Sequence, residues 1–244
     1  MRDGLAALAA LLLPDPVTAL AAVVVAAVVG GAGAAWAARL RARGVQVAYT
    51  RKLFHFVIFT TAAGVHAVLA LPGTIVFGTA IAALVLFAVV RGEGEPFYEA
   101  LARERDRPHR TLFIVVPLVT TAVGGLASAL VAGPYASVGY LAAGWGDAVG
   151  EPVGARWGRH RYRVPSLAGV PATRSWEGSA AVFVVASLGS SIALSGVGGA
   201  PWWGGLACGA VAAVVEGVSN HGLDNLTVQL APSLAALLLF GAGG

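Results

Sequence analysis

Eight stretches of mostly apolar residues recur along the chain, separated by short polar or Gly/Pro-containing segments. A helix needs about 20 such residues to cross the hydrocarbon core of a bilayer. Because backbone polar groups must find partners inside the segment when they lie in lipid, these stretches predict α-helices. The expected spans are 16–38, 53–71, 73–90, 111–132, 134–150, 177–197, 201–217 and 225–240. The sequence therefore predicts an all-α, polytopic transmembrane bundle.

Composition excludes a water-soluble domain. Only 11% of the residues are charged and 57% are hydrophobic, whereas about 25% charged residues are usual in soluble domains. The 33 glycines suit membrane helices that approach one another closely. A length of 244 residues leaves room for one bundle, so residues 1–244 are expected to form a single integral membrane domain. Cys208 lies in an apolar stretch and is expected to fill space in the packing.

Basic residues lie almost entirely in alternate connections between the expected spans. Five Lys or Arg residues fall in each of the segments 39–52, 91–110 and 151–176, whereas the other side carries only Arg2. The positive-inside rule places these three loops in the cytoplasm, together with 218–224, and both termini outside. The chain has no basic tail of the kind that would indicate a nucleic-acid partner. Since the polar sequence is concentrated on one face, the active site is expected on the cytoplasmic face.

Two carboxylates, Asp147 and Glu151, lie four residues apart at the end of the fifth expected span. This spacing puts them on one helical face. A carboxylate at such a depth needs a cation or a water-filled cavity. Two carboxylates one turn apart can share a hard cation such as Mg²⁺, so we expect a metal or substrate site. The alternative is a structural ion pair between Asp147 and an arginine.

A second polar segment precedes the sixth expected span. Ser175 is placed to cap that helix, with Glu177 in its first turn. The N-terminus of a helix also binds phosphate through its free N–H groups, and guanidinium groups match phosphate oxygens. Four arginines lie near this helix start: Arg156, Arg159, Arg163 and Arg174. A cap alone explains Ser175 but not four clustered arginines, so the segment predicts a polyphosphate site.

A third polar segment joins the last two expected spans and contains Glu216 and Asp224. It holds no Lys or Arg, so these acids are expected to lack a local partner. On the predicted topology they share a face of the membrane with Asp147. Asp224 is therefore a candidate for a second metal-binding carboxylate. A solvated turn is the alternative.

Two further segments are basic. Arg51, Lys52 and His55 share one helical face at the start of the second expected span. Taken alone, they are best explained as a basic flank whose side chains reach toward the membrane surface. The segment 95–109 predicts a short amphipathic helix, for which anchoring on anionic lipid is preferred to a catalytic role.

In their order along the chain, these motifs resemble the phytol kinase and dolichol kinase family, which phosphorylates long-chain lipid alcohols, typically with CTP. The resemblance covers about residues 51–230. It is carried by Arg-Lys-x-x-His from Arg51, by Gly-Asp at 146–147 followed by Gly-x-x-x-Gly-Arg, by Arg-Ser-Trp-Glu-Gly-Ser from Arg174, and by Asp-Asn-Leu-Thr-Val from Asp224. The second and third motifs also resemble phosphatidate cytidylyltransferase, a remote relative that uses CTP and Mg²⁺.

The resemblance implies a CTP-dependent kinase that transfers the γ-phosphoryl group to an isoprenoid alcohol such as phytol, geranylgeraniol or a polyprenol. Mg²⁺ would be held by Asp147 and Asp224, supported by Glu151 or Glu216. Lys52 would neutralise charge on the transferred group, and the general base is left open between Asp147, Asp224 and His55. The residues implied in nucleotide binding are Arg156, Arg159, Arg163, Arg174, Ser175 and Gly178.

Two alternatives stay open. One is a CTP transferase similar to phosphatidate cytidylyltransferase, which would act on a lipid phosphate. The absence of Lys and Arg from 218–224 favours a neutral alcohol over a lipid phosphate. The other is a transporter without catalysis, in which intramembrane acids would line a substrate path. The acids cluster at one face of the predicted bundle, which favours the enzyme.

Overall fold

The computed structural model describes residues 12–165, 172–198, 201–220 and 222–241, most of which are helical. A π-helical turn at Ala26–Gly30 joins α2 to α3, and short 3₁₀ turns lie at Glu104–Asp106 and Gly133–Tyr135. The helices and strands, in chain order, are α2 (Pro16–Val25), α3 (Gly31–Ala42), α4 (Val47–Arg91), α5 (Pro96–Leu101), α6 (Leu112–Ala132), α7 (Ala136–Trp157), β1 (Arg161–Val164), β2 (Ala172–Ser175), α8 (Trp176–Gly196), α9 (Trp202–Val218) and α10 (Asp224–Phe240).

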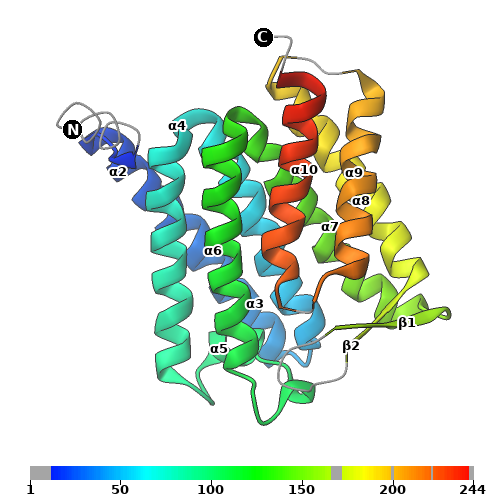
Figure 1. The fold of residues 1–244 in the computed structure, drawn as a ribbon. Helices are drawn as coiled ribbons and strands as arrows, with labels where there is room; N and C mark the ends of the chain where they lie inside the picture. Colours follow the sequence, from blue (N-terminus) through cyan, green and yellow to red (C-terminus); the bar gives the residue numbers. More distant parts are fainter. Residues whose placement is uncertain (1–11, 166–171, 199–200, 221, 242–244) are drawn as a thin grey trace.

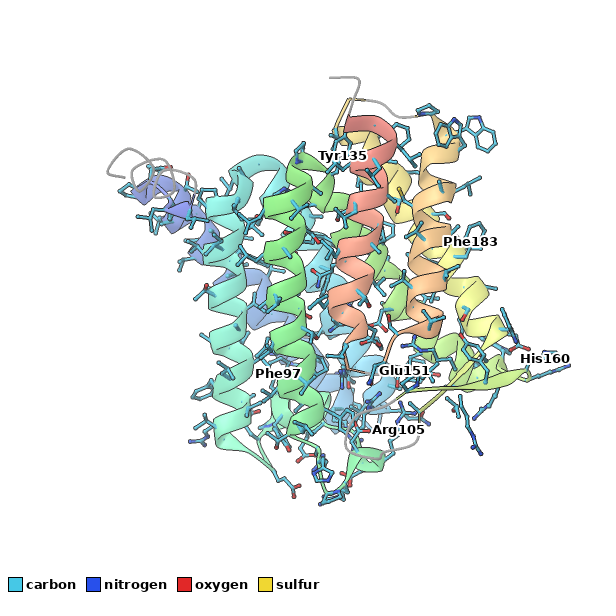
Figure 2. The ribbon with its side chains drawn as sticks, viewed as in Figure 1. Phe97, Arg105, Tyr135, Glu151, His160 and Phe183 are labelled. Atoms are coloured by element: carbon cyan, nitrogen blue, oxygen red, sulfur yellow. The ribbon has the colours of Figure 1, made fainter. Side chains whose placement is uncertain are left out.

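The helices form a bundle with two chemically different ends (Figure 1). The start of α2 and the end of α10 lie at one end, and α5 and the β1–β2 hairpin lie at the other. In Figure 2, Glu151 and Arg105 lie at the hairpin end, whereas Tyr135 lies at the opposite end. Large apolar side chains such as Val68, Val90 and Leu238 are exposed on the outside of the bundle. An apolar outer surface of this kind is expected where helices face lipid.

Four continuous helical stretches are long and apolar enough to cross a membrane: Pro16–Ala42, Val47–Arg91, Leu112–Trp157 and Trp176–Gly196. The remaining apolar helices, α9 and α10, have 17 residues each. The predicted all-α membrane bundle is therefore confirmed in outline. Each of the eight expected spans overlaps a helical segment, but their number as membrane crossings, and the side on which the termini lie, stay predictions.

Two of the long stretches turn back on themselves. The backbone of α4 breaks at Ala70 (φ 52°, ψ −159°), two residues before Pro72, and its two halves then run side by side. The α6–α7 stretch turns at Gly133, where φ is 54°. His66 links the two turns, since its ring contacts Thr74 Oγ1 at 3.2 Å and the Gly133 carbonyl oxygen at 3.0 Å. The turn at Gly133 lies between two predicted spans, and the break at Ala70 lies one residue before the end of the predicted span 53–71.

Glycines set the contact between α7 and α8. Gly146, Gly150 and Gly154 repeat at intervals of four along α7, so they share a face. An added Cβ on Gly150 would lie 2.6 Å from Val182 Cγ2, and one on Gly178 of α8 would lie 2.9 Å from the Gly150 carbonyl oxygen. Small residues let two membrane helices approach this closely. The start of α8 is thereby held against the part of α7 that carries Asp147 and Glu151.

The sequence does not predict the two short strands. β1 and β2 pair antiparallel, with Arg161 opposite Ser175 and Val164 opposite Ala172. Each strand has four residues, too few for a clear alternating pattern. Tyr162 fixes the hairpin to α8 through a 2.7 Å hydrogen bond between its hydroxyl group and Ser179 Oγ.

The segment after α4 folds inward. The short helix expected in 95–109 is present as α5, but Phe97 and Leu101 are buried, and Phe97 packs edge-to-face on Phe54 with ring centroids 4.8 Å apart. Thr50 Oγ1 also donates to the Ala100 carbonyl oxygen at 2.7 Å. The apolar face of this segment is used in packing on α4, whereas anchoring of its arginines on anionic lipid stays a prediction. Cys208 is fully buried, as expected.

Candidate active site

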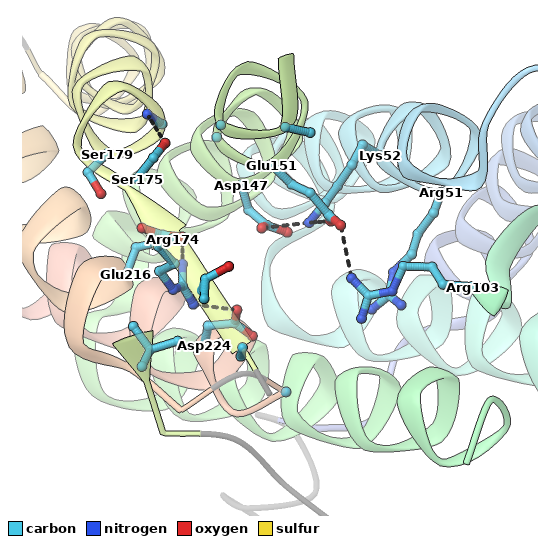
Figure 3. Close-up of a pocket in the computed structure, with 18 of the residues that line it drawn as sticks. Arg51, Lys52, Arg103, Asp147, Glu151, Arg174, Ser175, Ser179, Glu216 and Asp224 are labelled. Atoms are coloured by element: carbon cyan, nitrogen blue, oxygen red, sulfur yellow. Dashed lines mark hydrogen bonds and ion pairs between the residues drawn. The ribbon is translucent and has the colours of Figure 1, made fainter. Parts of the chain in front are cut away.

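A charged pocket of about 230 Å³ lies at the hairpin end of the bundle, where α4, α7, α8, α10 and β2 meet (Figure 3). Six basic and four acidic side chains line it, so the pocket carries an excess of positive charge. Such an excess attracts polyanions. The basic residues are Arg51, Lys52, Arg103, Arg105, Arg161 and Arg174, and the acids are Asp147, Glu151, Glu216 and Asp224.

Lys52 is the centre of one wall of the pocket. Its Nζ lies 2.6 Å from Asp147 Oδ1 and 3.4 Å from Glu151 Oε2, so the two carboxylates do share a face. His55 Nε2 lies 3.5 Å from Asp147 Oδ2. The partner of Asp147 is thus a lysine and not the arginine considered as an alternative. The interpretation of Lys52 as a surface-reaching flank is wrong, because its side chain is buried between helices.

Arg103 and Arg105 extend this wall, and sequence reasoning did not find them. Arg103 Nη1 lies 2.9 Å and Arg105 Nη2 2.6 Å from Glu151 Oε1, and Arg103 Nε donates to Asp106 Oδ2 at 2.8 Å. Burial alone would lower the pKa of Arg103, but the Glu151 and Asp106 carboxylates outweigh it and raise this pKa above its ordinary value. Nothing in the periodicity of 95–109 signals a contact with a helix about 50 residues away.

Arg174 is the centre of the opposite wall. It projects from β2 and forms ion pairs with Glu216 at the end of α9 and with Asp224, 3.0 Å away, at the start of α10. Asn225 Nδ2 donates to Thr121 Oγ1 at 2.9 Å and so holds the start of α10 on α6. Glu216 and Asp224 lack a partner within their own segment, as expected, but they have one in Arg174, which is distant in the sequence. Their partner comes from the hairpin, which the sequence did not predict.

The start of α8 faces the same pocket. Ser175 Oγ accepts a hydrogen bond from the Gly178 N–H at 3.1 Å, so the predicted N-cap is confirmed. Ser175, Gly178 and the neighbouring Thr173 line the pocket. The free N–H groups of the first turn carry partial positive charge, which favours an anion at this position.

The arginines expected before the hairpin are placed differently. Arg156, Arg159 and Arg163 do not line the pocket and are exposed. Since α7 continues to Trp157, Arg156 lies on its outer face, with its guanidinium 5.2 Å from the centroid of the Trp157 ring. Arg161 lines the pocket instead. The polyphosphate role predicted for the other three stays a prediction that their placement does not support.

The four acids form two pairs and not one cluster. Within the part of the chain that the structure describes, no three His, Cys, Asp or Glu side chains converge as a metal site would require. Mg²⁺ in nucleotide enzymes is usually held by one or two carboxylates together with substrate phosphates. The pairs Asp147–Glu151 and Glu216–Asp224 supply oxygen donors of this kind on two walls of one pocket. They therefore fit a metal that arrives with a nucleotide.

His55 lies beside a smaller, mainly apolar passage of about 100 Å³. This passage shares Arg51, Pro117 and Asn225 with the charged pocket and is otherwise lined mostly by apolar side chains such as Phe59 and Ile81. The His55 ring stacks on Phe59 with centroids 4.2 Å apart, and its buried Nε2 makes no hydrogen bond within the described residues. A ring nitrogen is thus available at the junction of charged and apolar space.

The chain is similar to a phytol kinase from Synechocystis sp. (strain PCC 6803), with 37% identity over 105 residues. The match covers 42% of this chain and 43% of that protein, so it spans less than half of either. It confirms the resemblance to phytol kinase that the motifs predict, while the remote similarity to cytidylyltransferases stays a prediction. No family model and no solved structure matches the chain.

Proposed function

We propose that this chain is a lipid-alcohol kinase that transfers the γ-phosphoryl group of CTP to the hydroxyl group of a long-chain isoprenoid alcohol such as phytol. The observation that carries the proposal is that a positively charged pocket and a mainly apolar passage adjoin at Arg51, Pro117 and Asn225, with His55 in the wall of the passage. A triphosphate suits the first environment and an isoprenoid chain the second. The similarity to a phytol kinase supports phosphoryl transfer to a lipid alcohol.

Phosphoryl transfer depends mainly on positioning and on neutralising charge. The first turn of α8 and the basic side chains Arg161 and Arg103 would hold the phosphates. Lys52, buried beside Asp147, would balance charge on the transferred group. The lipid hydroxyl oxygen bonds to the γ-phosphorus while the bond from that phosphorus to the oxygen of the departing CDP breaks.

The hydroxyl proton needs an acceptor near the apolar passage. Of the three candidates, only His55 lines this passage, and its Nε2 makes no hydrogen bond among the described residues, with Asp147 Oδ2 3.5 Å away. Asp147 and Asp224 line the charged pocket and already contact Lys52 and Arg174. We therefore assign His55 Nε2 as the proton acceptor, with Asp147 close enough to stabilise the imidazolium that forms.

Asp147 and Asp224, with Glu151 and Glu216, are the residues that would hold Mg²⁺ on the triphosphate, where it would offset the negative charge of the phosphate oxygens. Asp147→Asn and Asp224→Asn should each lower turnover about 100-fold or more, since a charge held on a metal contributes several kcal/mol. Glu93→Gln, at an exposed carboxylate outside the pocket, should leave turnover unchanged. Near-normal turnover in either pocket variant would remove that residue from the site.

The cytidylyltransferase reaction is the second candidate, because six basic side chains line the pocket even though 218–224 contains none. The two reactions attack different phosphorus atoms. The purified protein should be given phytol, and separately phosphatidate, with CTP labelled at the α or the γ position. We expect γ label to enter phytol and α label to enter neither lipid. Transfer of α label to phosphatidate would overturn the kinase, and no transfer to either lipid would favour a transporter.

A further inference from the structure

We infer that the apolar cavity enclosed by the two halves of α4 and by α6 binds the isoprenoid chain of the alcohol, and that the chain enters it sideways from the bilayer. The inference rests on the proposed function for the nature of the ligand. The cavity has a volume of about 330 Å³ and lies beyond the passage at His55.

The cavity, the passage and the charged pocket adjoin one another, since each neighbouring pair has lining residues in common. The cavity shares Ile58, Phe59, Ile81, Leu118 and Thr121 with the passage. The passage in turn shares Arg51, Pro117 and Asn225 with the charged pocket. We infer that the three spaces form one path from the proposed phosphate site into the apolar interior. A molecule with a hydroxyl group at one end and hydrocarbon behind it matches this order of environments.

The walls of the cavity offer few free polar groups. Phe59, Leu71, Phe77 and Ile81 supply buried hydrocarbon surface. Two of the larger polar side chains that border the cavity are hydrogen-bonded to the backbone. The Tyr140 hydroxyl donates to the Gly125 carbonyl oxygen at 2.9 Å. Gln229 Nε2 likewise donates to the Thr121 and Asn225 carbonyl oxygens. A ligand without hydrogen-bonding groups along its length fits such a surface.

The cavity opens on the outer side of the bundle. Gly78 and Thr79 on α4, and Ala122 and Leu126 on α6, line it and are exposed. These four residues lie in helical stretches that are long and apolar enough to cross a membrane, so their exposed side faces lipid. An added Cβ on Gly78 would meet no atom within 4 Å. The small residues Gly78 and Ala122 thus leave a gap through which an isoprenoid chain can pass from the bilayer. We call this gap the mouth of the cavity.

The path has the length of one leaflet. It runs along α6 from Ile114 to Leu126, about 18 Å at ~1.5 Å per residue. One leaflet contributes about 15 Å of hydrocarbon. The cavity therefore suits an alcohol whose apolar chain is about as long as a lipid acyl chain. Further isoprene units would lie outside the mouth and add nothing to recognition.

Filling the mouth tests the inference. Gly78→Phe and Ala122→Phe should each lower kcat/KM for a 20-carbon isoprenoid alcohol at least about tenfold, the scale on which a changed apolar pocket discriminates. The effect on a ten-carbon alcohol should be much smaller, because its shorter chain does not reach the mouth when bound and it is soluble enough in water to arrive through the charged pocket. Gly64→Phe is the matched control, since Gly64 lies in α4, outside the cavity, and an added Cβ there also meets nothing within 4 Å. Equal effects on both alcohols, or an equal effect of Gly64→Phe, would overturn the inference.

A binding experiment separates this inference from the proposed function. A 20-carbon alcohol with a photoreactive group at its far end should label residues within 71–82 and 118–126 of the protein in phospholipid vesicles, and Gly78→Phe should abolish that labelling. Labelling elsewhere, or labelling unchanged in Gly78→Phe, would overturn the inference whatever the activity. Labelling as expected without any phosphoryl transfer would keep the binding site and reject the kinase.

Discussion

Arg174 joins three elements that are distant in the sequence. Its guanidinium comes from β2 and pairs with carboxylates at the end of α9 and the start of α10, and all three side chains are largely buried. A buried ion pair contributes little net stability compared with apolar packing, but the loss of one partner leaves a charge uncompensated. Here that loss would leave both Glu216 and Asp224 without a counterion.

Arg174→Gln should therefore lower the free energy of unfolding by about 3 kcal/mol, the cost typical of breaking a buried pair. Thermal unfolding in detergent would measure it. Arg91→Gln removes an exposed arginine at the end of α4 and should change stability by less than about 0.5 kcal/mol. If Arg174→Gln destabilised the protein as little as Arg91→Gln, Arg174 would contribute to ligand binding and not to the stability of the fold.

At the scale of elements, the contact between α7 and α8 positions the site. Gly178 lies against the Gly150 carbonyl oxygen, and the helix cap at Ser175 lies one turn before it. Any side chain at Gly178 must push the start of α8 away from α7. Since Asp147 and Glu151 project from the same stretch of α7, such a shift would also widen the charged pocket.

Gly178→Ala should destabilise the protein by about 1–3 kcal/mol, as overpacking does, and should lower turnover as well. Gly196→Ala in the same helix is the matched control, because an added Cβ there meets no atom within 4 Å. The control should keep its stability, since alanine favours helix over glycine. Thermal unfolding and phosphoryl-transfer rates of the two variants check both statements. Wild-type stability in Gly178→Ala would show that the two helices adapt to the extra methyl group.

The helices could be predicted from the sequence because each depends on its own run of residues. The same holds for the cap at Ser175, which needs only its own helix, and for the shared face of Asp147 and Glu151. The hairpin and the inward packing of α5 could not be predicted, since both depend on contacts with other elements. The roles of Arg103 and Arg105, and the pairing of Arg174, depend on those elements in turn. Arg156 is close to the site in sequence but not in space, because α7 continues to Trp157 and carries Arg156 on its outer face.

At the scale of the whole molecule, the two ends of the bundle differ in charge. The charged pocket, the hairpin and the basic segment after α4 lie at one end, while the described ends of the chain lie at the other. The 21 residues of α8 lead from one end to the other, about 30 Å at ~1.5 Å per residue. That length equals the thickness of a bilayer's hydrocarbon core.

Single cysteines placed at Arg161 and at Ser195, in a Cys208→Ala background, should consequently lie on opposite sides of the membrane. A membrane-impermeant reagent should therefore distinguish them in intact cells. Both positions are exposed and lie near opposite ends of α8. We expect Ser195→Cys to react from outside, and Arg161→Cys only after the membrane is permeabilised. Reaction of both from outside would contradict the predicted topology.

A sideways mouth at Gly78 and Ala122, as we infer it, would change what concentration means for the kinase that we propose. A substrate that never leaves the bilayer is diluted by other lipids and not by water, so the rate should follow its mole fraction in the membrane. With enzyme and alcohol held constant in vesicles, added inert phospholipid should lower the rate, whereas added buffer should leave it unchanged at saturating CTP. A rate that falls with added buffer would mean that the alcohol reaches the site through water. The phosphorylated product would remain in the leaflet from which its alcohol came, with a charged head that can no longer return along the apolar path.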